Sequence, residues 1–194
     1  MLLLTLRGTL TIYNGDEIGM QQVMLRGNEI QDPLEKRVPG LGVGRDGCRT
    51  PMQWNGEKFA GFSIAMPWLP VAPGYHNRNV AQQKDEPASM LQLYHRLIEL
   101  RRRHEALQIG SYRPIAAADE LLLFIREHCG EKLLIALNMG RESMSVGFAN
   151  GLLRGEILLS SFCDRDTELI DGIVNLRSDE GTIIKLAADA IVPA

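Results

Sequence analysis

The residue pattern of this chain changes in character near position 110, and this change limits the folds that the chain can adopt. Before it, residues 85–107 carry apolar side chains at the i, i+3, i+4 and i+7 spacing of an amphipathic helix, with Asp85 as a suitable N-cap. After it, short apolar segments alternate with turn residues. The sequence therefore predicts two domains, residues 1–110 and residues 111–194.

Six short segments after position 110 are predicted to be strands. They are rich in aliphatic residues, and turn residues separate them about every ten positions. Strands of this length and spacing are typical of a small antiparallel β-sandwich. Residues 128–131 and 138–140 lie where hairpin turns are expected. The six segments are 121–126, 132–137, 143–148, 156–160, 172–176 and 182–186.

The first domain is predicted to be irregular over most of its length. Residues 1–6 are nearly all apolar, which is typical of a buried helix end, and Gly8 would terminate that helix. Residues 9–13 are predicted to form a strand, because they are β-branched and aromatic and are followed by Asn14-Gly15. From Gln21 to Gly40 the chain is polar and interrupted by proline and glycine, which predicts a long loop. Long ordered loops tend to be functional.

Composition and charge exclude several classes of protein. The chain is 45% hydrophobic and 23% charged, with a net charge of -3, which is typical of a soluble globular protein and disfavours nucleic acid or a membrane as partner. Cys48, Cys129 and Cys163 are odd in number and match no zinc or redox motif, which favours a reducing cytoplasm. No phosphate-binding glycine loop, metal-ligand spacing or Ser-His-Asp arrangement is present, so we expect no cofactor and no metal.

A polar loop from Gly44 to Trp54 gathers the residues best suited to recognition. Arg45 and Arg49 offer planar sets of N–H donors that suit vicinal hydroxyls or carboxylates. Trp54 offers an apolar face that a sugar ring can cover, and Gln53 adds an amide. These residues also have an ordinary structural interpretation, because loop arginines are commonly solvated or ion-paired and a single tryptophan is commonly packed.

Two segments resemble the α-glucosidases of glycoside hydrolase family 13, in the oligo-1,6-glucosidase and maltase-like branch. Gly44–Trp54 is similar to the family's "RDxxRTPMQW" segment, and Gly8–Met20 is similar to its "GTPxxYYGDEIGM" segment. Leu10 replaces a usual proline, and Asn14 replaces a usual tyrosine or glutamine. The resemblance covers nearly the whole chain, more weakly after position 110, and implies that the chain is the C-terminal part of such an enzyme.

The resemblance implies a specific fold. Residues 9–13 would be the last strand and residues 85–107 the last helix of a TIM (β/α)8 barrel, followed by the small antiparallel β-sandwich domain. One strand and one helix cannot close a barrel, so the leucines of residues 1–6 would lack their core. We therefore expect the first residues to be mobile, or to associate with another chain through the exposed last strand.

The resemblance also implies roles for individual residues. Arg45 corresponds to the arginine that helps to hold the non-reducing-end glucose, and Asp16 and Glu17 match an acidic pair that either contacts substrate or supports the site. A structural role in pinning the loop is expected for the other motif residues, with sugar contact as the alternative. The nucleophilic, acid/base and third essential carboxylates of the family lie on earlier barrel strands, so no catalytic residue is expected here. The other motif residues are Arg49, Gln53 and Trp54.

The sequence thus predicts the C-terminal portion of a retaining α-glucosidase that hydrolyses terminal α-glucosidic bonds of short oligosaccharides. It would bind a small α-glucoside only with the rest of the barrel, and alone it would be inactive. One alternative is a parent with glucosyl transferase or isomerase activity, such as a trehalose synthase or sucrose isomerase. Others are a non-catalytic glycan-binding or assembly module, and a truncated product without activity.

Overall fold

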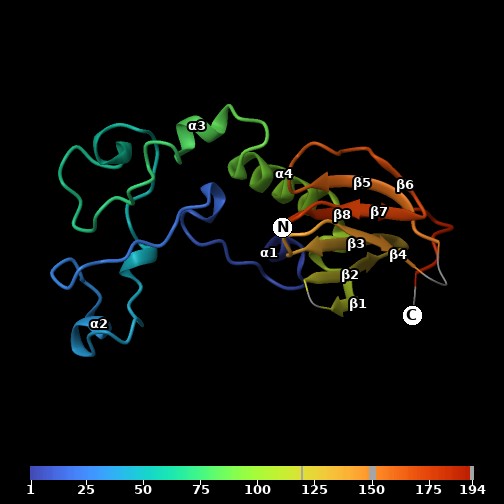
Figure 1. Cartoon of the computed structure of the whole chain (residues 1–194), viewed down its shortest axis with the longest axis horizontal. Coiled ribbons are helices and arrows are strands. Elements are labelled where there is room, and N and C mark those ends of the chain that lie inside the picture. The colour runs from blue at the N-terminus through green and yellow to red at the C-terminus, as the bar shows by residue number, and fades with distance from the viewer. Residues whose placement is uncertain (119, 149–151, 193–194) are drawn as a thin grey trace. The chain divides into compact units, whose positions relative to one another are not determined.

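The structure, a computed structural model, describes residues 1–118, 120–148 and 152–192 (Figure 1). The chain divides into two compact units. We call Met1–Leu10 together with Leu93–Ala194 the sheet unit, and Thr11–Gln92 the loop unit. The sheet unit is therefore built from both ends of the sequence. Residue 110 lies inside it, and the domain boundary expected there stays a prediction.

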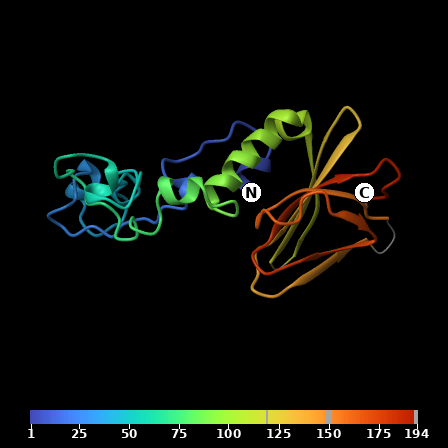
Figure 2. The same cartoon turned by 90° about the horizontal axis from the view of Figure 1, so that it is seen from above.

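The described part of the sheet unit contains two antiparallel sheets, shown from a second direction in Figure 2. All six segments that the sequence predicted to be strands are confirmed. The first sheet has the order β1-β2-β3-β8-β5-β6, and the second pairs β4 with β7. The strands are β1 Ser111–Ala118, β2 Leu121–His128, β3 Glu131–Asn138, β4 Met144–Gly147, β5 Arg154–Ser160, β6 Leu169–Asp171, β7 Ile173–Leu176 and β8 Gly181–Leu186.

The two strands that the sequence did not predict lie at the edges of the larger sheet. β1 contains Pro114, which cannot donate to a ladder, and its pairing with β2 shifts register between Pro114 and Ala116. An edge strand tolerates such a residue because one side needs no hydrogen-bond partner in the sheet. β6 is only three residues long. Neither strand carries enough β-forming sequence to be recognised without its neighbour.

One of the two predicted hairpin turns is confirmed. β2 and β3 meet at Cys129-Gly130, both with positive φ (48° and 84°), and His128 pairs with Glu131 across the turn. The second prediction was wrong, because β3 and β4 belong to different sheets. There the Asn138 amide donates to the carbonyl oxygens of Glu142 and Arg177, so the segment crosses between sheets instead of reversing within one.

A hydrophobic cluster joins the two sheets of this unit. Aliphatic residues of β2, β3, β5 and β8 pack against residues of β4 and β7. Burial of these side chains supplies the main stabilisation of the unit. The cluster includes Ile125, Leu134, Ile157, Ile184, Val146, Val174 and Leu176.

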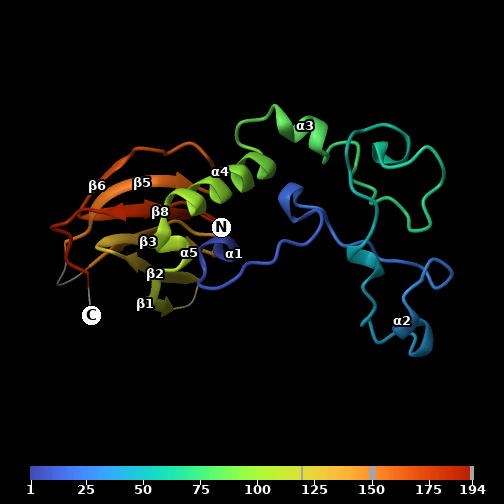
Figure 3. The same cartoon turned by 180° about the vertical axis from the view of Figure 1, so that it is seen from behind.

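The first residues of the chain are part of the sheet unit, contrary to the prediction that they lack a core. Helix α1 (Leu2–Thr5) lies beside α5 and the adjoining ends of β2 and β3 (Figure 3). Leu4 is only 1% exposed, whereas Leu3 and Leu6 remain 40% and 38% exposed. Residues after position 93 supply the core that accepts Leu4, and the sequence pattern of residues 1–6 alone could not indicate them.

The predicted long helix exists in a shorter form. Helix α4 (Met90–Arg103) begins at Met90. The Ser89 Oγ just before it accepts the N–H of Gln92 at 3.2 Å, so Ser89, and not Asp85, caps this helix. Asp85 instead follows the short helix α3 (Val80–Lys84) as its C-cap. His104 separates α4 from α5 (Glu105–Gln108). The basic last turn of α4 agrees with the helix dipole.

The loop unit has little regular structure. Its elements are η1 (Asp16–Ile18), α2 (Pro33–Arg37), η2 (Asp46–Cys48) and η3 (Lys58–Gly61), followed by α3 and the start of α4. A small core forms around Ile18, Met52 and Leu91, with Met20 and Val80 packed against it.

The strand predicted at residues 9–13 is absent, because no strand of the described residues pairs with this segment. The described chain is a mixed α/β structure with antiparallel sheets. None of its helices is long and apolar enough to cross a bilayer.

Candidate functional site

The Arg45 loop, residues 31–49, is held together by carboxylates that accept backbone N–H groups. Asp46 is buried, and its Oδ2 accepts the N–H groups of Gln31 and Asp32, both at 2.6 Å. Asp32 in turn accepts the N–H of Arg45 at 3.2 Å and that of Leu34 at 2.9 Å. Because hydrogen bonds from the Arg45 and Leu34 backbone favour the ionised form, the pKa of Asp32 lies below its ordinary value.

Glu35 makes the largest set of these contacts. Its two carboxylate oxygens accept the N–H groups of Gly40, Gly42, Val43 and Gly44 at 3.0 to 3.4 Å. Hydrogen bonds from Gly44 and Gly40 are the main causes that hold the pKa of Glu35 below its ordinary value. The carboxylate therefore replaces the backbone partners that this irregular segment would have in a helix or strand.

Arg45 lies at the N-cap of η2 and is exposed. Its carbonyl oxygen accepts the N–H and the Sγ–H of Cys48, at 3.2 and 3.1 Å. Within residues 1–118, 120–148 and 152–192, no hydrogen bond or ion pair engages its guanidinium. The donors of this group are therefore not used by the described residues, and no contact links it to Asp16 or Glu17 in them. Its role in holding a sugar stays a prediction.

Arg49 connects the Arg45 loop to the segment around Asp16. Its Nε donates to the Tyr13 hydroxyl at 3.3 Å, and this hydrogen bond is the main reason that the pKa of Arg49 is raised. The backbone N–H of Tyr13 donates to Asp16 Oδ2 at 2.8 Å. The structure thus brings together Arg49 and Asp16 through Tyr13, a residue that the sequence analysis did not select.

Asp16 and Glu17 both stabilise their own turn. Glu17 Oε2 accepts the N–H of Gly15 at 2.9 Å, while Asp16 caps Tyr13. Gly15 has φ of 94°, and a Cβ atom there would lie 2.5 Å from Met20 Sδ. Only glycine fits this position without strain.

Gln53 and Trp54 pin the loop through their backbones. Their carbonyl oxygens accept the N–H groups of Val80 and Ala81, both at 2.9 Å, so they hold the start of α3. The Gln53 side chain is 1% exposed, whereas Trp54 is 50% exposed. The Gln53 side chain is therefore closed to solvent and the Trp54 ring is half exposed, while the choice between loop support and sugar contact stays a prediction for both.

Two hollows lie in the loop unit, and neither is lined by Arg45, Asp16 or Glu17. The first, of about 260 Å³, lies between residues 22–25 and the Arg45 loop, where Glu35 and Asp46 line it. The second is open, about 590 Å³ in volume, and is formed by residues 55–64. The described residues contain no group of His, Cys, Asp and Glu side chains suited to a metal ion.

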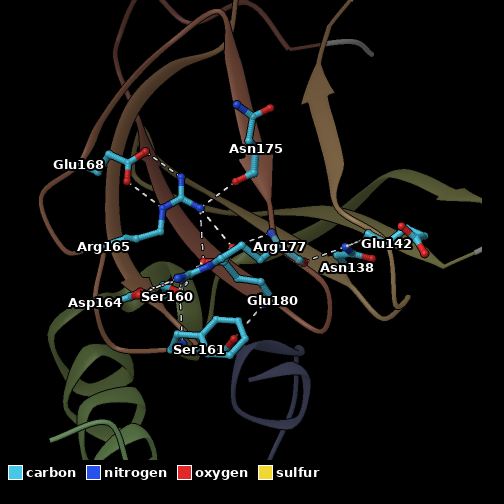
Figure 4. Close-up of polar contacts among 12 residues, drawn as sticks. Asn138, Glu142, Ser160, Ser161, Asp164, Arg165, Glu168, Asn175, Arg177 and Glu180 are labelled. Carbon is cyan, nitrogen blue, oxygen red and sulfur yellow. Dashed lines mark hydrogen bonds and ion pairs between the residues drawn. The ribbon is translucent and has the colours of Figure 1, made fainter.

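The sheet unit carries a buried ionic network that the sequence analysis missed (Figure 4). Glu180 is fully buried and accepts from the side chains of Arg177 at 2.8 Å, Arg165 at 3.2 Å and Ser160 at 2.6 Å. Burial by itself would raise the pKa of Glu180, but the hydrogen bonds from Arg177 outweigh it and hold the pKa at about 2. Asp164 pairs with Arg177, and Glu168 pairs with Arg165. This network is internally satisfied and offers no free catalytic group.

The chain is similar in sequence to proteins of known family. Residues 1–110 match the family described as "Alpha amylase, catalytic domain". The chain is 39% identical over 142 residues to a probable alpha-glucosidase of Rhizobium meliloti (strain 1021), covering 73% of this chain and 26% of that protein. It is 37% identical over 155 residues to an oligo-1,6-glucosidase of Halalkalibacterium halodurans, covering 71% and 28%.

Solved structures give a similar result. The isomaltulose synthase SmuA from Protaminobacter rubrum superposes with a TM-score of 0.84 and 27% identity, over 96% of this chain and 37% of that one. A MutB variant in complex with the substrate sucrose superposes with a TM-score of 0.85 and 28% identity, again over 96% and 37%. The chain therefore spans between about a quarter and two fifths of the length of these proteins.

Proposed function

Because this chain belongs to the alpha-amylase catalytic-domain family, we propose that it is the C-terminal portion of a retaining α-glucosidase acting on terminal α-glucosidic bonds of short oligosaccharides. It contributes Arg45 to the sugar-binding site, and Asp16 and Glu17 either contact the substrate or support the site. The observation that carries this proposal is the exposed Arg45 guanidinium, which has no hydrogen-bond partner in the part of the chain that the structure describes. It projects from a loop whose backbone is fixed by hydrogen bonds.

The chain by itself is proposed to be inactive. Glycoside hydrolysis needs two carboxyl groups about 5 to 10 Å apart, one as acid and one as nucleophile or base. Five acids of the loop unit accept backbone N–H groups, which is a structural role, and the family resemblance places the catalytic acids on barrel strands that this chain does not supply. The five that accept N–H groups are Asp16, Glu17, Asp32, Glu35 and Asp46.

We also propose the finer architecture that the family implies. Residues 9–13 become the last strand of a (β/α)8 barrel when neighbouring strands are supplied, and α4 with α5 forms its last helix. The two antiparallel sheets form the β-sandwich domain of residues 111–194. The three cysteines are free, in keeping with a cytoplasmic location.

A specific observation favours a second candidate. The solved structures that resemble this chain include isomaltulose synthases, so the parent activity could be isomerisation of sucrose rather than hydrolysis. Both reactions begin with the same covalent step in a retaining site, and they differ in what attacks the intermediate. The products that are released, and not the fold, distinguish hydrolysis from isomerisation.

One experiment tests these proposals. The chain is fused to the portion of the Rhizobium meliloti relative that it does not match, and maltose, isomaltose and sucrose are supplied. We expect glucose release by the fusion and none by the isolated chain. Arg45→Ala should lower kcat/KM by about 10- to 100-fold, since a hydrogen bond from a charged group is lost.

The exposed Arg102 provides a matched control, and Arg102→Ala should leave kcat/KM unchanged. Conversion of sucrose into an isomer would favour the second candidate. Glucose release by the isolated chain would contradict the placement of the catalytic acids. An inactive fusion, together with glycan binding by the isolated chain, would favour a binding module.

A further inference from the structure

We propose that Asp32 and Glu35 are positioning residues for Arg45, because their carboxylates fix the backbone from which its guanidinium projects. This inference rests on the proposed role of Arg45 in holding glucose. It goes further by assigning a role to two acids that the sequence analysis did not select.

The segment before Arg45 needs an external support. Gly40 and Gly42 have φ of 85° and 66°, and glycine is the residue that loses most conformational freedom on ordering. No helix or strand covers residues 38–45. The four N–H groups that Glu35 accepts are therefore the main restraint on the path of this segment.

Gly44 and Glu35 are matched in shape as well as in hydrogen bonding. A Cβ atom on Gly44 would lie 2.8 Å from Glu35 Cβ, so the backbone approaches the glutamate more closely than any other residue would allow. This approach holds the residue directly before Arg45 against a short helix, α2. The contact between Gly44 and Glu35 therefore sets the backbone direction just before Arg45.

Asp32 and Asp46 lock Arg45 itself through a reciprocal arrangement. Asp32 accepts the N–H of Arg45, while Asp46, the next residue, accepts the N–H of Asp32. Asp32 is therefore hydrogen-bonded both to Arg45 and to Asp46, and these two bonds fix the backbone on either side of the Arg45 Cα atom. Neither carboxylate pairs with the Arg45 guanidinium in the described part of the loop, which leaves its donors for a ligand.

The backbone restraint can be measured on the intact chain without any activity. We expect Glu35→Ala and Asp32→Ala to speed amide hydrogen exchange at Val43, Gly44 and Arg45 by about 10- to 100-fold. Glu29→Ala is the control, because Glu29 also accepts one backbone N–H, from Arg26, in its own turn. It should leave these three amides unchanged.

Glu35→Gln is a milder variant that controls for unfolding of the loop unit. Its amide oxygen can still accept backbone N–H groups, although its amide nitrogen cannot. Its exchange rates should lie between those of the wild type and Glu35→Ala. Unchanged exchange at Ile135 in β3 reports that the sheet unit is intact. Wild-type exchange at Val43, Gly44 and Arg45 in both alanine variants would overturn the proposal.

A double-mutant cycle in the fusion tests whether these residues act through Arg45. Asp32→Ala and Glu35→Ala should each lower kcat/KM by about tenfold in the wild-type background, chiefly by raising KM, and by less than twofold in the Arg45→Ala background. Equal losses in both backgrounds would overturn the positioning role. An inactive wild-type fusion would count against the proposed function alone, and the exchange rates would then decide this inference.

Discussion

Arg126 donates from Nη1 to the carbonyl oxygen of Thr5 at 2.6 Å, and so joins two residues that lie 121 positions apart in the sequence. The guanidinium is fully buried and also donates to the carbonyl oxygens of Gly110 and Ser111. Burial, together with repulsion from Arg101 and Arg7, lowers its pKa from the ordinary value. Arg101 binds three neighbouring carbonyl groups, those of Leu4, Leu6 and Gly8. The N-terminal segment is therefore a bound part of the sheet unit.

Replacing Arg126 should destabilise the sheet unit. Arg126→Met keeps much of the side-chain volume but leaves buried carbonyl oxygens without donors, which costs roughly 1 to 3 kcal/mol each. We expect the free energy of unfolding in urea to fall by about 3 kcal/mol or more. Arg102→Met at an exposed site is the control. A loss as small as that of the control would show that the buried guanidinium does not hold the segment.

Glu180 should make stability depend on pH. Its pKa is about 2 in the folded chain, against an ordinary value of 4.5, so the ionised form is favoured by folding. Its contribution is therefore complete above about pH 5 and is lost as the pH falls through 2. We expect a fall of about 3 kcal/mol in the free energy of unfolding over this range.

Glu180→Gln supplies the comparison for this pH dependence. The variant cannot titrate, so its unfolding free energy should be lower at pH 7 and should change less between pH 5 and pH 2. Urea unfolding at a series of pH values measures both. Curves of the same slope for the two proteins would assign the acid sensitivity to other carboxylates.

Gly15→Ala should weaken the turn that carries Asp16 and Glu17. The positive φ and the overlap with Met20 together cost roughly 1 to 3 kcal/mol. Gly27→Ala is the matched control, because Gly27 has no positive φ and no atom lies within 4 Å of the place that its Cβ would take. Faster proteolysis of the loop unit in Gly15→Ala, and not in Gly27→Ala, is the expected result.

The exposed apolar residues of the loop unit should promote association. Ile64, Met66 and Trp68 are 104%, 85% and 77% exposed, and neighbouring exposed apolar residues mark contact surfaces or aggregation sites. Replacing all three with serine should lower light scattering and raise solubility at equal concentration. If the variant scatters as strongly as the wild type, the association must involve another surface. Association through residues 9–13 would then be tested next, and it stays a prediction.

The sequence by itself determined the features that depend on local pattern. Short aliphatic segments separated by turn residues identified the six predicted strands. The 3.6-residue period of apolar side chains identified α4, because it reflects burial of one helix face. The Gly8–Met20 and Gly44–Trp54 segments identified the family, and the match of residues 1–110 to the alpha-amylase catalytic domain confirms it. The sequence also selected Arg45 as a sugar contact, and that role stays a prediction. In the described residues its side chain is exposed and has no hydrogen-bond partner.

Only the tertiary structure decided which distant residues support these elements. Thr9–Tyr13 has strand-forming residues but forms no strand, because a strand needs a neighbour to bond with. Leu4 is buried because Arg101 and Arg126 bind the carbonyl groups around it, and no local pattern announces a partner 121 positions away. Glu35 likewise reads as one charged residue of a short helix, and its four backbone contacts exist only once the glycine segment folds back over it.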